Sequence, residues 1–82
     1  MESIKVYGAP WCPDCHRTRR FLDEHQVPYL WFDIDEDPKA LAYVQTLQDG
    51  GRTIPTVIID DGGDPLFEPT DDQVAKRLGL AD

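Results

Sequence analysis

The sequence predicts an α/β fold, a four-stranded mixed sheet flanked by three helices, with residues 1–82 forming a single domain. Short β-branched and aromatic segments alternate with amphipathic ones in the order strand, helix, strand, helix, strand, strand, helix. A helix joins the first two strands, so they should run parallel. A short turn joins the last two, so they should run antiparallel.

The first part of the chain is predicted to contain two strands and the helix between them. Ile4–Tyr7 should be a buried strand, and a helix follows over His16–Gln26. Cys12 is the expected N-cap of this helix, because Pro13 suits the first helical position, where its missing N–H is not needed. Tyr29–Ile34 is strand-like in residue type. One helical stripe carries Cys15, Thr18, Leu22 and His25.

The middle of the chain is predicted to form a second helix. Asp37 is its expected N-cap, Pro38 its first residue, and Gly50-Gly51 its end. The apolar residues of this helix share one face: Leu41, Val44 and Leu47.

A hairpin and a third helix complete the predicted fold. Thr56–Ile59 and Leu66–Phe67 should be strands joined by a turn over residues 60–64. The segment Thr70–Gln73 matches a capping box, in which two side chains pair with backbone N–H groups that a helix start leaves free. Gly79 is the expected end of this helix.

The chain has only two cysteines, and both lie in the stretch Trp11-Cys12-Pro13-Asp14-Cys15 at a predicted strand-to-helix junction. Such a pair is typical of thioredoxin-type redox chemistry. The sulfur of Cys12 should face the free N–H groups of the first helical turn. These donors and the helix dipole favour the thiolate, which is the species that attacks disulfides.

Composition limits the partners that the protein could have. The net charge of −8 argues against nucleic acid and against an anionic membrane surface. No apolar run approaches the ~20 residues of a transmembrane helix, and the first residues lack a signal-peptide pattern. We therefore expect a cytoplasmic protein with no membrane contact. In that compartment a cysteine pair is more often catalytic or metal-binding than a structural crosslink.

The order of elements, with Cys12–Cys15 after the first strand and Thr53-Ile54-Pro55 before the third, resembles the glutaredoxin family of the thioredoxin-like fold. The resemblance covers essentially the whole chain. The segments Gly50–Val57 and Glu68–Thr70 look most like the mycoredoxins, which use mycothiol in place of glutathione. The run Cys15–Arg20 is instead similar to the redoxins that supply electrons to ribonucleotide reductase.

The resemblance implies a dithiol thiol–disulfide oxidoreductase that acts as a monomer and has no bound cofactor or metal. Cys12 would attack a mixed disulfide or a protein disulfide, and a second small thiol or Cys15 would then release the enzyme. The co-substrate would be a low-molecular-weight thiol, either mycothiol or glutathione. The electrons would come from such a thiol or from a flavin-dependent reductase.

The resemblance also implies a substrate-binding surface around the dithiol. Pro55 would be a cis proline that turns the backbone of Ile54 toward the bound thiol. Thr70 and Asp71 would hold the free end of that thiol, although plain helix capping is a second interpretation. The other candidate binding residues are Trp11, Pro13, Arg52 and Thr53. Trp11 is expected at the lip of the substrate groove rather than in the core.

Charged residues near the motif have two interpretations each. Four arginines are predicted to be solvated: Arg17, Arg19, Arg20 and Arg52. The alternative, mainly for Arg52, is that they recognise a carboxylate of a partner or a substrate. Asp14 either favours the first turn of the helix or opposes thiolate formation.

Three positions depart from the related families. Ala9 stands where glutathione-binding members often have Lys or Arg, and Glu68-Pro69 where they often have Gly-Gly. Both departures favour mycothiol over glutathione. Val6 stands where thioredoxins have a buried acid, so an internal proton acceptor of that kind is missing.

Two alternatives stay open. One is a ribonucleotide-reductase redoxin that thioredoxin reductase reduces directly, with Cys15 obligatory. The other is an adaptor that binds a metal or an iron–sulfur cluster. Zinc needs about four ligands, whereas the chain has two cysteines and two histidines. Pro13 in the motif disfavours a cluster shared between two subunits.

Overall fold

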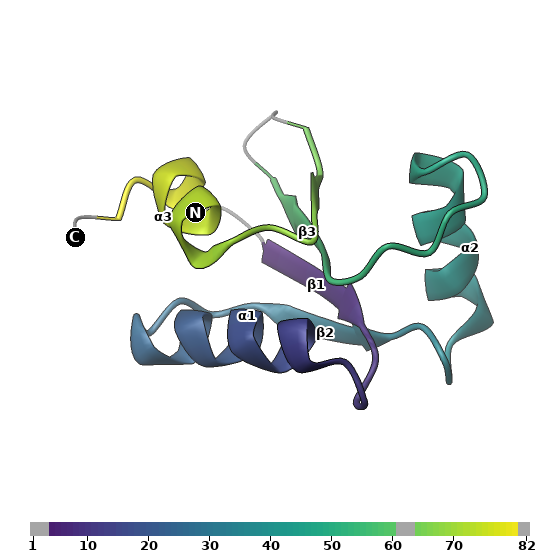
Figure 1. Ribbon diagram of the computed structural model, residues 1–82, viewed down its shortest axis with the longest axis horizontal. Helices are drawn as coiled ribbons and strands as arrows, with labels where there is room; N and C mark the ends of the chain where they lie inside the picture. The colour runs from purple at the N-terminus through teal and green to yellow at the C-terminus, as the bar shows by residue number, and fades with distance from the viewer. Residues whose placement is uncertain (1–3, 61–63, 81–82) are drawn as a thin grey trace.

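The described residues of this computed structural model, 4–60 and 64–80, form a four-stranded mixed sheet in the order β2-β1-β3-β4 (Figure 1). Strand β1 (Ile4–Gly8) pairs in parallel with β2 (Leu30–Asp33) and antiparallel with β3 (Thr56–Ile59). Strand β3 pairs antiparallel with β4 (Leu66–Phe67). The predicted sheet is therefore confirmed, while the centre of the predicted hairpin turn lies outside the described residues.

Three helices cover the two faces of the sheet: α1 (Pro13–Glu24), α2 (Pro38–Leu47) and α3 (Asp71–Leu78). Helices α1 and α3 lie on one side and α2 on the other (Figure 1). Successive strand residues point to opposite faces, so each face has its own core. The core under α1 and α3 contains Ile4, Val6, Leu22, Val57, Ile59 and Val74. The core under α2 contains Tyr7, Ile34, Ala40 and Val44.

All three helix starts lie where local sequence signals predict them. Cys12 caps α1 with Pro13 in its first turn, and Asp37 caps α2 by accepting two backbone N–H groups. Thr70 caps α3, where its hydroxyl accepts from the N–H of Gln73 at 3.2 Å and the Gln73 amide accepts from the N–H of Thr70 at 2.8 Å. The predicted capping box is present.

The predicted end of α1 at Gln26 is wrong by two residues, because the helix ends at Glu24. Gln26 adopts a left-handed φ of +57°. Its N–H donates to the carbonyl of Asp23 at 3.0 Å, and that of Val27 to the carbonyl of Leu22 at 2.8 Å. This pattern is a Schellman cap. This cap usually has glycine or asparagine at the left-handed position. Because the residue here is glutamine, the sequence did not predict that the helix ends before it.

The early end of α1 changes the predicted stripe. Cys15, Thr18 and Leu22 are fully buried, as predicted, but His25 is an exposed C-cap residue. Its Nδ1 lies 2.9 Å from the carbonyl oxygen of Phe21. The other boundaries also shift slightly: β2 is shorter than Tyr29–Ile34 at both ends, and α2 ends before Gly50.

Thr70→Ala should lower the free energy of unfolding by about 0.5–2 kcal/mol, because it removes the hydroxyl that caps α3. Thr70→Ser keeps this hydroxyl and should restore most of the loss. Urea unfolding of the reduced proteins measures both effects. Equal stability of Thr70→Ala and the unchanged protein would contradict a capping role.

Candidate active site

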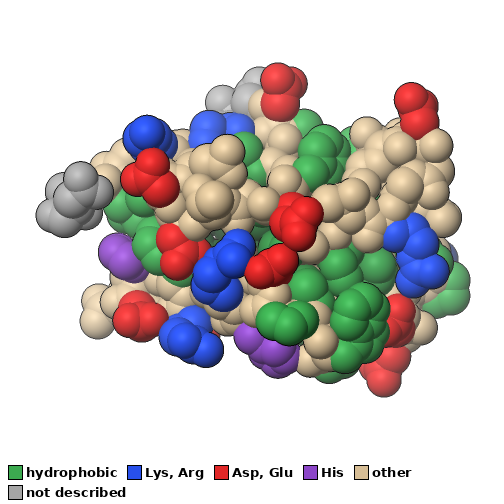
Figure 2. All heavy atoms as spheres, viewed as in Figure 1, with side chains coloured by type: hydrophobic (Ala, Val, Ile, Leu, Met, Phe, Trp, Pro, Cys, Tyr) green, Lys and Arg blue, Asp and Glu red, His purple; other side chains and the backbone are tan. Residues whose placement is uncertain are grey.

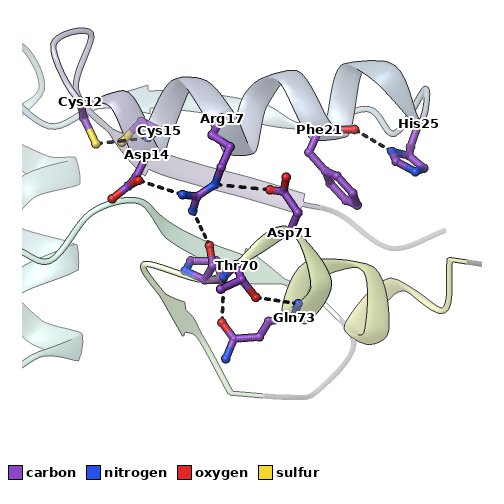
Figure 3. A network of polar contacts seen from close by, with 10 residues as sticks. Cys12, Asp14, Cys15, Arg17, Phe21, His25, Thr70, Asp71 and Gln73 are labelled. Atoms are coloured by element: carbon purple, nitrogen blue, oxygen red, sulfur yellow. Dashed lines mark hydrogen bonds and ion pairs between the residues drawn. The ribbon is translucent and has the colours of Figure 1, made fainter. Parts of the chain in front are cut away.

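Cys12 and Cys15 lie at the N-terminal end of α1, and both are free thiols (Figure 3). Cys12 is the N-cap residue, with an extended backbone at φ −88° and ψ 112°. Its Sγ accepts the backbone N–H of Cys15 at 3.2 Å. A sulfur atom in this position receives a backbone donor and the positive end of the helix dipole, and both stabilise negative charge on it.

Cys15 has a different environment from Cys12. Both residues are buried, with a relative exposure of 0% for Cys15 and 5% for Cys12. Burial, followed by the hydrogen bond with Cys12, raises the pKa of the Cys15 thiol to about 12, while a backbone hydrogen bond at Ala9 acts in the opposite direction. Cys15 is therefore a protonated thiol at neutral pH. The two sulfurs of the motif are chemically unequal.

The burial of Cys15 depends on Gly8, the last residue of β1. A Cβ at Gly8 would collide with the Sγ of Cys15 and lie 2.9 Å from the ring of Trp31. The indole of Trp31 packs beside Ala9, Cys12 and Cys15. Only glycine leaves the sulfur and the ring enough room, so the end of β1 fixes the depth at which the dithiol sits.

Arg19 covers the outer face of Trp31. Its guanidinium lies 4.1 Å from the ring centroid, and its Nε donates to the hydroxyl of Tyr29 at 3.2 Å. The prediction that Arg19 is a solvated side chain is therefore wrong. A guanidinium stacks well on an aromatic ring. Trp31 lies in β2 and Tyr29 directly precedes it, so Arg19 connects α1 to this strand. Arg20 is exposed, as predicted.

Arg17 also differs from its prediction as a solvated side chain. Its Nη1 lies 2.8 Å from Oδ1 of Asp14, and its Nη2 donates to the carbonyl of Pro69 at 2.9 Å. Its Nε faces Oδ1 of Asp71 at 3.5 Å (Figure 3). One side chain thus connects the cysteine motif, the loop before α3 and the first turn of α3.

Trp11 and Arg52 meet at a carboxylate that the sequence did not single out. Trp11 is 67% exposed, so it is not a core ring. Its Nε1 donates to Oδ2 of Asp35 at 2.6 Å, and Nη2 of Arg52 lies 3.6 Å from Oδ1 of the same residue. Asp35 stands in an acidic run that precedes α2, and that run did not predict either contact.

Hydrophobic side chains gather near the start of α1 on the face in Figure 2.

The loop before β3 brings Ile54 to the dithiol. Ile54 is half-buried against the cluster of Ala9, Cys12 and Cys15, and the Ile54–Pro55 peptide bond is cis, as the resemblance implied. The backbone of Thr53 is fixed by the side chain of Gln48. Its N–H donates to Oε1 of Gln48 at 2.8 Å, and its carbonyl accepts from Nε2 of Gln48 at 3.1 Å.

The other candidate binding residues lie in α1 and α3. Pro13 is exposed at the start of α1. Thr70 and Asp71 begin α3, where the first is a cap and the second contacts Arg17. The charged candidates therefore belong to two polar groups that have no residue in common, Trp11–Asp35–Arg52 and Asp14–Arg17–Asp71.

No metal centre is evident within residues 4–60 and 64–80. No three side chains among His, Cys, Asp and Glu converge there as possible ligands. The same residues contain no helix that is long and apolar enough to cross a membrane.

A dithiol at the N-terminus of the helix that follows β1, on a four-stranded mixed sheet, defines a thioredoxin-like redox protein. The sequence profile of the glutaredoxin family matches residues 4–62. Mycoredoxin 1 of Corynebacterium glutamicum is 36% identical over 81 residues, which cover 99% of this chain and 100% of that protein. The chain belongs to the glutaredoxin family, whose members are thiol–disulfide oxidoreductases.

Two solved structures share this fold along almost their full length. The thioredoxin-like protein BC3987 superposes with a TM-score of 0.79 at 30% identity, and the match covers 90% of this chain and 97% of that one. The glutaredoxin-like NrdH-redoxin from Escherichia coli gives a TM-score of 0.78 at 25% identity, covering 98% and 99%. The predicted glutaredoxin-type fold is confirmed.

Iodoacetamide should alkylate Cys12 and spare Cys15 in the reduced native protein at about pH 8. With a pKa of about 12, only about one Cys15 thiol in 10⁴ is ionised at that pH, and its sulfur is buried. Fragment-ion mass spectrometry locates the adduct. Protein unfolded in urea is the control, and there both cysteines should react. Comparable rates at the two sites of the native protein would contradict the inequality of the thiols.

Proposed function

We propose that this protein reduces mixed disulfides of a low-molecular-weight thiol, and protein disulfides, with Cys12 as nucleophile and Cys15 as resolving thiol. The observation that carries the proposal is the inequality of the two sulfurs. Cys12 occupies the N-cap of α1, accepts a backbone N–H and keeps 5% exposure, whereas Cys15 has 0% exposure and is protonated. This arrangement favours nucleophilic attack by Cys12 at the N-terminus of α1. Cys15 then attacks the resulting mixed disulfide and releases the substrate.

The proposed reaction has two thiol–disulfide exchange steps. The thiolate of Cys12 attacks the accessible sulfur of a disulfide, which forms a mixed disulfide on Cys12 and expels the other half as a thiolate. The thiolate of Cys15 then attacks the sulfur of Cys12 and expels the second half, or a second small thiol does so instead. Cys15 must first lose its proton. Val6 is a buried valine rather than an acid, so this position supplies no base for that step.

We propose mycothiol as the preferred small thiol over glutathione. Similarity to Mycoredoxin 1 over the full length supports this choice. Glutathione carries two carboxylates, and two of the arginines near the motif are already engaged, Arg17 by Asp14 and Asp71 and Arg52 by Asp35. Mycothiol is neutral apart from its thiol. It could use the exposed indole of Trp11 and hydroxyl groups such as those of Thr70 and Thr53.

A second candidate is a redoxin that a flavin-dependent reductase reduces directly and that supplies ribonucleotide reductase. The structural similarity to the NrdH-redoxin from Escherichia coli supports it, since that protein has a thioredoxin-like activity profile. In either case we propose a cytoplasmic monomer that consists of one domain over residues 1–82 and needs no bound cofactor. A coupled assay with mycothiol, glutathione and thioredoxin reductase as parallel donors separates the candidates.

Cys12→Ser should abolish all activity, because no other thiol occupies the open helix end. Cys15→Ser should keep activity on mixed disulfides of a small thiol and lose activity on protein disulfides, which need the resolving thiol. Both variants are assayed on both substrate classes. Loss of both activities in Cys15→Ser would exclude the small-thiol route and favour the reductase-driven redoxin.

The mixed disulfide of mycothiol should react at least about tenfold faster than that of glutathione, which corresponds to about 1.4 kcal/mol in the transition state. The reason is that Ala9 offers no cation, Pro69 offers no N–H, and Arg17 and Arg52 are paired within the chain. The measurement is kcat/KM for both disulfides on the Cys15→Ser protein. Equal rates, or faster reaction of the glutathione disulfide, would reject mycothiol as the preferred thiol.

A further inference from the structure

Arg17 makes three polar contacts that fix it between the cysteine motif and α3. It lies 2.8 Å from Asp14, donates to the carbonyl of Pro69 at 2.9 Å and faces Asp71 at 3.5 Å (Figure 3). The side chains of Arg17 and Asp14 are each 41% exposed, whereas the Lys76–Asp72 pair of α3 is 79% and 67% exposed. Arg17 is therefore held more firmly than an ordinary surface cation.

Asp14 places a negative charge beside the dithiol. It stands between the two cysteines in the sequence, in the first turn of α1, and points to Arg17 (Figure 3). After burial and the hydrogen bond with Cys12, the charge of Asp14 is among the smaller causes that raise the pKa of Cys15. An unpaired charge at about 7 Å, in an effective dielectric of about 40–80, would change a thiolate equilibrium about three- to eightfold.

We propose that Arg17 is a positioning residue that neutralises Asp14. An unpaired Asp14 carboxylate would destabilise the reduced form of the Cys12–Cys15 pair, and this neutralisation removes that effect. The inference rests on the proposed role of these cysteines as a redox pair. Arg17 acts through Asp14 rather than directly on either sulfur, because Nη1 is aimed at the carboxylate. Its contacts with Pro69 and Asp71 hold the guanidinium in that place.

Other charged groups surround the dithiol and must be constant in the test. They are His16 on α1, Asp35 before α2, Arg52 before β3, Glu68 between β4 and α3, and Asp71 at the start of α3. None of them changes among the variants below, so their contributions cancel when the variants are compared at one pH.

The test is the equilibrium between this protein and a reference thioredoxin of about −270 mV. The disulfide of one protein and the dithiol of the other exchange two electrons and two protons, and the four species are separated by chromatography. At a pH where Cys12 is a thiolate in the reduced protein, Arg17→Gln should shift the equilibrium constant about three- to eightfold toward the Cys12–Cys15 disulfide, or about 14–27 mV at 29.6 mV per tenfold change. An unchanged constant would overturn the proposal.

Matched variants separate charge neutralisation from other effects. Asp14→Asn alone should change the constant less than about twofold, because the charge is already neutralised. Adding Asp14→Asn to Arg17→Gln should cancel the shift. Arg17→Lys keeps the positive charge but cannot make all three contacts of the guanidinium, so it should shift the constant less than Arg17→Gln does. Arg20→Gln removes the same charge from an exposed site on α1 and should have as little effect as Asp14→Asn.

Three results contradict the proposal. An equal shift in Arg17→Gln with and without Asp14 would mean that Arg17 acts on the sulfurs directly. An equal shift in Arg20→Gln would mean that only net charge matters. If Arg17→Gln does not fold, Asp14→Asn decides, since a shift of about threefold or more would show an unneutralised carboxylate.

Failure of this inference can be distinguished from failure of the proposed function. If no disulfide between Cys12 and Cys15 forms in equilibrium with the reference thioredoxin, the proposed redox role fails. If that disulfide forms and all the variants share one equilibrium constant, only the role of Arg17 fails.

Discussion

The contact between the sulfur of Cys15 and the end of β1 is the constraint on which the active site depends. The sulfur occupies the space that a side chain at Gly8 would fill, so α1 must begin directly above the last residue of the strand. This depth buries Cys15 completely and leaves Cys12 at the N-cap. The different chemistry of the two thiols therefore follows from how closely the helix approaches the sheet, and needs no further charged group.

The charges around this site are mostly satisfied within the chain. Arg17 binds Asp14 and Asp71, and Arg52 shares Asp35 with the indole of Trp11. An anionic ligand would have to displace these carboxylates, which an acidic protein of net charge −8 has in excess. A neutral ligand would meet no such competition.

Signals that act over a few residues predicted most of the fold. The capping residues Cys12, Asp37 and Thr70 marked the three helix starts, since each cap pairs with an N–H group within three residues. The cysteine pair likewise predicted the centre of the site. The contact of Arg17 with Asp14 is an i,i+3 pair that helix spacing allows for. Its contacts with Pro69 and Asp71 were not predictable, because Pro69 is 52 residues away and no pattern in the sequence connects the two.

The residues that a bound thiol would use are also residues that stabilise the fold, and the energies involved allow both roles. Thr70 caps α3, yet its exposed side chain keeps lone pairs for a second partner. The side chains of the Arg17–Asp71 pair are 41% and 42% exposed, but the two facing atoms, Nε of Arg17 and Oδ1 of Asp71, are buried, lie 3.5 Å apart and make no hydrogen bond. Because this contact is long, a ligand could replace it while Arg17 kept its shorter contacts with Asp14 and the carbonyl of Pro69. Substrate could bind at the start of α3 without releasing the charge beside the dithiol.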